Sequence, residues 1–165
     1  MSDHANQISI RVIACGALAR EILAINELNQ LTQLDVKCLP AIWHNHPEKI
    51  APGVKEAIHA ARDEGFKHIY VAYADCGTSG EIDKLLEKEG IQRLPGAHCY
   101  SVYAGESAFR ELSEEEPGTF YLTDFLALHF ERLVVKGLKL DTHPGLRDDY
   151  FGNYRKLVYL SQRID

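Results

Sequence analysis

Apolar, β-branched segments that alternate with amphipathic helical segments are the feature of this sequence that most restricts its fold. The first segment, ISIRVIA at residues 8–14, has the composition of a strand buried on both faces. Further strand-like segments follow at LDVKCL, which Pro40 ends, at HIYVAYA in residues 68–74, and around IQRL. Helical segments separate them, namely ALAREILAINEL, a segment that ends at about Arg62, residues 79–88 and residues 105–115. This alternation predicts an α/β fold, with a mainly parallel sheet of about four to five strands flanked by helices in a single domain, residues 1–165.

The last third of the chain, from about residue 117, has a different character and is rich in helical and aromatic residues. The string GTFYLTDFLALHFERLVVKGLKL predicts one long helix that ends at Gly137. Its apolar face would consist of Leu122, Phe125, Leu126, His129 and Leu133. The strand-like VYLSQ follows. Because a helix normally covers such a strand, we expect the chain to be a short version of the fold, truncated at its C-terminus.

Composition and charge exclude several classes of protein. The chain has 165 residues and a formal net charge of −6, which argues against a nucleic-acid partner because such proteins need a basic surface. No run of about 18 apolar residues is present, so no membrane span or membrane partner is expected. The polar start MSDHANQ lacks the features of a secretory signal. We therefore predict a cytoplasmic protein, whose 4 cysteines are reduced and act as buried residues, metal ligands or nucleophiles.

The cysteines stand in similar places along the chain. Cys15, Cys38, Cys76 and Cys99 each fall at or just after the predicted end of a different strand. Since the carboxyl ends of parallel strands share one edge of a sheet, where ligands bind, we expect these thiols to converge there with His98. Cys and His are the preferred ligands of zinc, and an all-cysteine set also suits an iron–sulfur cluster. The sequence predicts a zinc or iron ion ahead of an iron–sulfur cluster, although no Cys-x-x-Cys spacing supports it.

Cys76 has a second candidate role, as a nucleophile. Thr78 and Glu81 form a Thr-x-x-Glu capping box, which predicts Thr78 as the N-cap of a helix and places Cys76 beside unpaired amides. Such a position lowers the pKa of a thiol and favours the reactive thiolate. The same turns predict exposed backbone for cofactor binding, at Gly16, Gly77, Thr78 and Gly80. The alternative is that each cysteine is a small apolar residue at a tight turn.

Three histidines and an aspartate are further candidates. His44 and His46 stand two residues apart, and in an extended segment both imidazoles would face one metal ion. The alternative is a polar loop that leads into a helix. His129, on the apolar face of the last-third helix, is a candidate proton acceptor or else a hydrogen-bonded core residue. Asp75, next to Cys76, is the other candidate proton acceptor.

Several strings along the chain resemble a known family. They are IACGALAREI, CLPA followed by HNHP, VAYADCGTSG, LPGAHCY, PGTFYLTDFL and DYFGNYRKLVYL, and they span roughly residues 9–162. In these strings the chain resembles family 1638 of the domains of unknown function, found in bacteria and methanogenic archaea. Genes of that family often lie near corrinoid-dependent methyltransferase genes, so the resemblance implies a link to one-carbon or methylamine metabolism. The strings contain all 4 cysteines, together with His98 and His44.

The combined interpretation is a metal- or cofactor-binding α/β protein that acts on a small-molecule substrate in one-carbon metabolism. The predicted metal ligands are Cys15, Cys76, His98 and Cys99, followed by His44 and His46. Enzyme activity is left open, and its candidate catalytic residues are Cys76, Asp75 and His129. One alternative is an accessory module that docks on a corrinoid protein or methyltransferase through the aromatic segment Tyr150–Tyr159, with corrinoid itself a less favoured cofactor. Another is a metal-free enzyme with Cys76 as its nucleophile.

Overall fold

The structure is a computed structural model that describes residues 9–162. The chain forms two compact units, Met1–Pro95 and Gly96–Asp165. The boundary between them comes earlier than residue 117, where the sequence changes character. That all 165 residues make up one domain stays a prediction.

The first unit is built on a four-stranded parallel sheet. Its strands are β1 (Ile10–Cys15), β2 (Leu34–Leu39), β3 (His68–Ala72) and the short β4 (Gln92–Arg93). They lie in the order β2-β1-β3-β4, and neighbouring strands pair in parallel. These strands confirm the predicted α/β fold and parallel sheet, while Ile8, at the start of the first predicted strand, lies outside the described residues.

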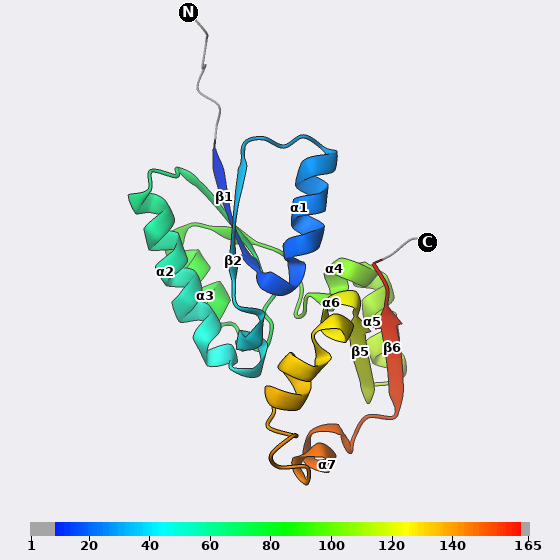
Figure 1. The fold of residues 1–165 in the computed structure, drawn as a ribbon. Coiled ribbons are helices and arrows are strands. Elements are labelled where there is room, and N and C mark those ends of the chain that lie inside the picture. The colour runs from blue at the N-terminus through cyan, green and yellow to red at the C-terminus, as the bar shows by residue number, and fades with distance from the viewer. Residues whose placement is uncertain (1–8, 163–165) are drawn as a thin grey trace, which may run out of the picture. The chain divides into compact units, whose positions relative to one another are not determined.

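Helices cover both faces of this sheet (Figure 1). Helix α1 (Ala19–Leu28) lies on one face, and α2 (Ile50–Asp63) and α3 (Glu81–Glu89) lie on the other. Alternate residues of each strand point to opposite faces, so Ile13 and Val71 enter the core under α2 and α3. Val12 and Ala14 instead face α1. The larger core therefore lies on the α2 and α3 face.

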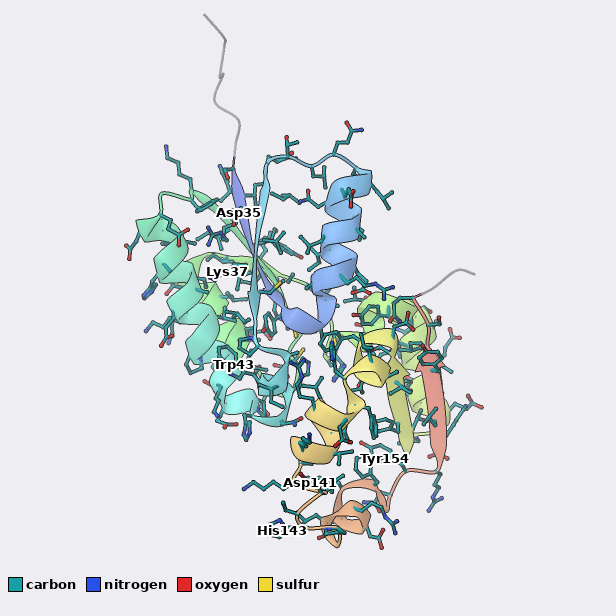
Figure 2. All side chains as sticks on the ribbon, in the orientation of Figure 1. Asp35, Lys37, Trp43, Asp141, His143 and Tyr154 are labelled. Carbon is teal, nitrogen blue, oxygen red and sulfur yellow. The ribbon has the colours of Figure 1, made fainter. Side chains whose placement is uncertain are left out.

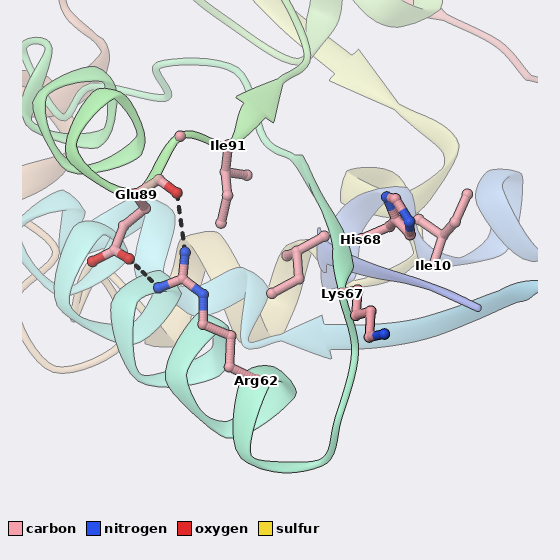
Figure 3. A pocket seen from close by; sticks show the side chains of 8 residues that line it. Ile10, Arg62, Lys67, His68, Glu89 and Ile91 are labelled. Carbon is pink, nitrogen blue, oxygen red and sulfur yellow. Dashed lines mark hydrogen bonds and ion pairs between the residues drawn. The ribbon is translucent and has the colours of Figure 1, made fainter. Parts of the chain in front are cut away.

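Charged side chains close the amino edge of the sheet. Arg62, in the last turn of α2, pairs with the Glu89 carboxylate and donates a further hydrogen bond of 3.0 Å to the Glu89 backbone oxygen (Figure 3). The buried Arg11 of β1 pairs with Asp35 and Glu64 at 2.8 and 2.6 Å. These pairs fix the ends of α2 and α3 against the sheet, and they leave the opposite, carboxyl edge to the loops.

The second unit contains a two-stranded parallel sheet. It is made of β5 (Thr119–Thr123) and β6 (Lys156–Leu160). Its helical elements are α4 (Tyr100–Ala104), α5 (Glu106–Glu115), α6 (Asp124–Leu128), the π-helical η4 (Glu131–Lys136) and α7 (Leu146–Phe151). In neither unit does the described chain hold a helix long and apolar enough to cross a membrane.

The prediction of one long helix over residues 118–140 is wrong. Its first part is strand β5, because Thr119, Phe120, Tyr121 and Thr123 are β-branched or aromatic residues that favour strands. Helix α6 begins only at Asp124, where the Thr123 hydroxyl accepts the Leu126 N–H at 3.2 Å as an N-cap. The predicted apolar face therefore does not exist as one helical stripe.

Replacing Ile58 by Ala is expected to lower the free energy of unfolding by about 2–5 kcal/mol, because truncation leaves a cavity in the core of the first unit. Ile58 is 0% exposed. The matched control is Ile25→Ala in α1, whose side chain is 56% exposed and should cost less than about 1 kcal/mol. Urea denaturation followed by circular dichroism measures both, and equal losses would contradict the position of Ile58 in the core.

Candidate functional site

The carboxyl edge of the first unit's sheet contains a topological switch point. The connection from β1 to β2 runs through α1 on one face, whereas the connection from β3 to β4 runs through α3 on the other. The adjacent strands β1 and β3 therefore send their following loops apart, and ligands bind in such crevices in open α/β sheets. Cys15 is the last residue of β1, and Cys76 follows the end of β3. The two thiols thus lie where this fold class places its ligand sites.

The loop that carries Cys76 has an unusual backbone. Cys76 has a φ of +50° and Ser79 a φ of +55°, in the left-handed region that side chains rarely adopt. Gly77 and Gly80 have φ values of +83° and +81°. Left-handed non-glycine residues cost about 1–3 kcal/mol each and cluster at functional sites. The structure therefore holds the Cys76 thiol in place at a conformational cost.

Asp75 holds this loop together, in place of the predicted capping box. Its carboxylate accepts hydrogen bonds from the Thr78 hydroxyl at 2.6 Å, from the Gly80 N–H at 2.8 Å and from the Ser79 N–H at 3.2 Å. Helix α3 begins at Glu81 with Gly80 as its N-cap, so the prediction of Thr78 as N-cap is wrong. Thr78 instead accepts a long hydrogen bond of 3.4 Å from the Ile82 N–H.

The same contacts argue against Asp75 as a proton acceptor. Partial burial would raise the pKa of Asp75, but the hydrogen bonds from Thr78, Gly80 and Ser79 outweigh burial and hold the pKa below its usual range. A carboxylate with a lowered pKa is a weak base at neutral pH. Asp75 is therefore a structural residue that shapes the loop carrying Cys76.

His44 is positioned by its neighbour Trp43. Both lie in the 3₁₀ helix η2 (Ala41–Asn45), and Figure 2 shows Trp43 beside α2. A Cβ atom built on Gly53 of α2 would lie only 2.2 Å from Trp43 Cζ3, so the indole ring packs where a side chain would otherwise be. The hydrophobic pattern of the sequence does not reveal this contact, although a glycine inside a helix is a signal for it, since glycine costs about 1 kcal/mol there.

The imidazole of His44 lies among sulfur atoms. Its Nδ1 atom is 3.2 Å from the Ala41 carbonyl oxygen and 3.8 Å from Cys15 Sγ. The ligand atoms of His44 and Cys76 lie within 4.8 Å of one another. We call Cys15, His44 and Cys76 the thiol–imidazole cluster. Because a carbonyl oxygen only accepts, the contact with Ala41 fixes the proton on Nδ1 and directs the Nε2 lone pair toward a ligand.

The two neighbouring thiols raise the pKa of His44. Burial by itself lowers the pKa of His44, but hydrogen bonds to Cys15 and Cys76 and their negative charge raise it to about 10. Burial raises the pKa of the Tyr73 hydroxyl, and the nearby Cys15 raises it further. Tyr73 therefore stays a neutral phenol beside the cluster, a position that no motif in the sequence indicates.

Other predicted site residues of the first unit lie outside the cluster. Cys38 pairs in register with Ala14, which faces α1, so the two-residue period of β2 turns its exposed thiol to the other face of the sheet. His46 is exposed and lies 3.6 Å from Glu48, because His44 stands in a 3₁₀ helix rather than in an extended segment, where residues two apart would face the same way. The prediction that His44 and His46 face the same way is therefore wrong.

The predicted cofactor-binding residues have structural roles. A Cβ on Gly16 would lie 3.0 Å from the Leu39 oxygen, so this glycine lets two chain segments pack closely. Gly77 and Gly80 supply the left-handed turns of the loop, and the buried Thr78 donates to Asp75. None of these contacts tests cofactor binding, which stays a prediction for all four residues.

The remaining predicted residues belong to the second unit. His98 Nδ1 accepts the Tyr100 N–H at 3.3 Å and lies 3.6 Å from Cys99 Sγ. The His98 ring stacks on Tyr100 with centroids 4.0 Å apart. His129 contacts Phe125 edge to face at 4.6 Å. The roles of Cys99, His98 and His129 in a site stay predictions.

Fold and site define an α/β protein with a thiol–imidazole cluster at the carboxyl edge of a parallel sheet. Residues 38–165 match the family described as "Protein of unknown function (DUF1638)". The chain belongs to this family, which confirms the resemblance seen in its sequence. No curated protein and no solved structure matches the chain. Its chemistry is therefore inferred from the cluster itself.

Replacing Asp75 by Asn is expected to destabilise the protein by about 1–2 kcal/mol at pH 7, after allowance for solvent screening, because the amide cannot accept all three hydrogen bonds. The folded-state pKa of Asp75 lies below its unfolded value of about 3.9, so the carboxylate stabilises the fold above that pH. The stabilisation is lost as the pH falls through the folded-state pKa.

Urea denaturation of wild type and Asp75→Asn between neutral and acidic pH tests this expectation. The difference between the two proteins should shrink as the pH falls. Asp63→Asn, at an exposed position of α2, is the matched control and should show no such dependence. A constant difference at every pH would contradict the role of the carboxylate charge.

Proposed function

We propose that this chain is a metal-binding protein whose ion, preferably zinc, is held by His44 and Cys76, with Cys99 as the further ligand that the sequence predicts. The observation that carries the proposal is the oriented His44 ring, with Nδ1 against the Ala41 carbonyl, next to the Cys76 thiol. Histidines that bind metals usually donate their other ring N–H to a carbonyl or carboxylate, which fixes the tautomer. His44 therefore already has the outer hydrogen bond of a ligand that binds through Nε2.

The chemistry of the donors supports zinc. Thiolate sulfur and imidazole nitrogen are the ligands that zinc prefers, and iron is the second choice. A set of one histidine and two cysteines is typical of catalytic zinc, which keeps one position open for water or substrate. A zinc ion bound there would supply Lewis-acid chemistry to a small-molecule substrate. Cys15 lies on the Nδ1 side of His44, and its sulfur accepts the Ala17 N–H at 3.4 Å, so we assign it an outer, supporting role.

The assignment of Cys99 comes from the sequence. Like Cys15 and Cys76, Cys99 falls at or just after the predicted end of a strand, where ligands bind in parallel sheets.

A second candidate function is a metal-free enzyme with Cys76 as nucleophile. It is supported by the raised pKa of His44 beside the Cys76 thiol, which favours a thiolate–imidazolium pair. In this function His44 activates the thiol rather than binding a metal. Rapid alkylation of Cys76 in metal-free protein, lost in His44→Ala, would favour this candidate.

The metabolic context is a further part of the proposal. The family resemblance suggests that the substrate or partner belongs to corrinoid-dependent one-carbon metabolism in the cytoplasm. An accessory role would use the aromatic segment, where Tyr150, Tyr154 and Tyr159 are 48%, 44% and 52% exposed. Exposed aromatic side chains are enriched at protein interfaces. Pull-down with a corrinoid methyltransferase, compared with Tyr150→Ala, tests this role.

Protein purified without oxygen is expected to bind one equivalent of zinc, and cobalt substitution should produce the near-ultraviolet absorption of thiolate-to-cobalt charge transfer. Loss of an outer hydrogen-bond partner of a ligand weakens metal binding by about 10–100-fold. The substitutions of proposed ligands should each weaken zinc binding by more than this, namely His44→Ala, Cys76→Ser and Cys99→Ser. Cys15→Ser should stay within that range. Cys38→Ser is the matched control and should bind as wild type does, since Cys38 faces the other side of the sheet.

Two results would contradict the proposal. A metal content below about a tenth of an equivalent in anaerobically purified protein, with no binding on titration, would exclude a metal site. Undiminished cobalt charge transfer in Cys99→Ser, with loss in Cys15→Ser, would replace Cys99 by Cys15 as the third ligand.

Gly53→Ala is expected to weaken zinc binding by about 10–100-fold although every ligand is intact, because the new methyl group displaces Trp43 and with it His44. Alanine favours a helix over glycine, so local helix formation cannot explain a loss. The control is Gly145→Ala, where a Cβ meets nothing within 4 Å. Isothermal titration with zinc measures both, and wild-type affinity in Gly53→Ala would show that Trp43 does not position His44.

A further inference from the structure

A groove of about 580 Å³ lies wholly within the second unit and has no part in the proposed metal site. Its floor is one face of the β5–β6 sheet, where Phe120 and Leu157 are paired in register and both line the groove. Its wall comes from the segment between the strands, including Val134 and Val135 of η4 and Phe151 of α7. Its volume is that of a typical small-molecule pocket, about 300–1,000 Å³.

The lining of the groove is apolar and aromatic. The ring of Phe120 contacts Phe151 and Tyr154 edge to face, with centroids 5.6 and 5.4 Å apart. Figure 2 shows Tyr154 near the lower end of this sheet. Leu157 is 62% exposed and Phe130 is 37% exposed, so the apolar lining extends to solvent. A contiguous apolar surface of this kind marks a binding site more often than a random patch does.

The charged residues at the groove are all cations. Arg147, Arg155 and Lys156 line it, and among the described lining residues there is no Asp or Glu, in a chain whose net charge is −6. Arg147 pairs with Asp148 at 2.9 Å and Lys156 with Glu115 at 3.0 Å. Within residues 9–162, the Arg155 guanidinium has no acidic partner. Arg155 is therefore the cation that remains available to a ligand.

The wall of the groove provides an independent indication. Residues Glu131–Lys136 form a π-helical turn, a rare conformation that is frequent at functional sites. Both Val134 and Val135, which are consecutive in this turn, line the groove. The rare turn thus shapes the apolar wall opposite the sheet.

We propose that this groove binds a small organic anion with an apolar body, such as a medium-chain carboxylate. The apolar chain lies between Phe120, Leu157 and the η4 turn. The carboxylate lies at the mouth, where the planar guanidinium of Arg155 donates two parallel N–H hydrogen bonds to its oxygens. Burial of the chain provides the affinity, and Arg155 selects the sign of the headgroup.

Isothermal titration of the full chain with three twelve-carbon probes tests the proposal, namely dodecanoate, dodecanol and dodecyltrimethylammonium, each below its aggregation limit. Dodecanoate should bind one to one and roughly 3–10-fold more tightly than dodecanol, as expected for an exposed ion pair. In Arg155→Glu the order should reverse, so that the cationic probe binds more tightly than dodecanoate. Arg132→Glu makes the same charge change on exposed η4 without lining the groove, and should keep the wild-type order.

Leu157→Asp separates the groove from nonspecific adsorption. Leu157 is exposed, so the variant should fold, and a charge on the groove floor should abolish binding of dodecanoate and dodecanol. Equal affinity for dodecanoate and dodecanol, an unchanged order in Arg155→Glu, or full binding in Leu157→Asp would each overturn the proposal. So would the absence of binding by all three probes.

Discussion

The parallel pairing of β1 with β3 is the interaction on which the candidate site depends. It aligns Ile13 with Val71 and Ala14 with Ala72, so the ends of the two strands lie side by side. Because α1, after β1, and α3, after β3, leave toward opposite faces, the loops that follow the two strands diverge and form a crevice. Cys15 and the loop of Cys76 occupy that crevice, and η2 brings His44 to it from β2.

A hydrogen-bond network and a packing contact hold the loops around the crevice in place. Asp75 binds three donors of its own loop, and this network offsets the cost of left-handed Cys76 and Ser79. The indole ring of Trp43 packs against the backbone of Gly53, and this contact fixes the position of η2 against α2. The cluster is thus preorganised, since neither the thiol nor the imidazole has to be recruited from a flexible loop.

The two units show different kinds of binding chemistry. The first has soft, ionisable donors at the carboxyl edge of a parallel sheet, an arrangement suited to a metal ion or an activated thiol. The second forms an apolar groove whose lining includes three cations, over a small sheet and the segment between its strands. A chain that carries both has room for an ion-dependent reaction and for recognition of an amphiphilic anion.

Hydrophobic patterning predicted most elements of the first unit, because strands buried on both faces and one-faced helices leave a clear period in the sequence. It failed at residues 118–140, where β5 and α6 follow each other without a break and their apolar residues merge into one run. The position of the site at the strand ends could also be predicted. The sequence could not predict which cysteines meet there, since strand register decides the face of the sheet on which each side chain lies.

The sequence by itself determined that strands alternate with helices and that thiols stand at strand ends. Only the tertiary structure decided that Cys15 and Cys76 share a face with His44 while Cys38 points away, because strand register sets the direction of every side chain. It also decided that Asp75 is a loop acceptor and that His46 leaves the site. Local residue types define which chemistry is available, and long-range packing selects which atoms come within bonding distance.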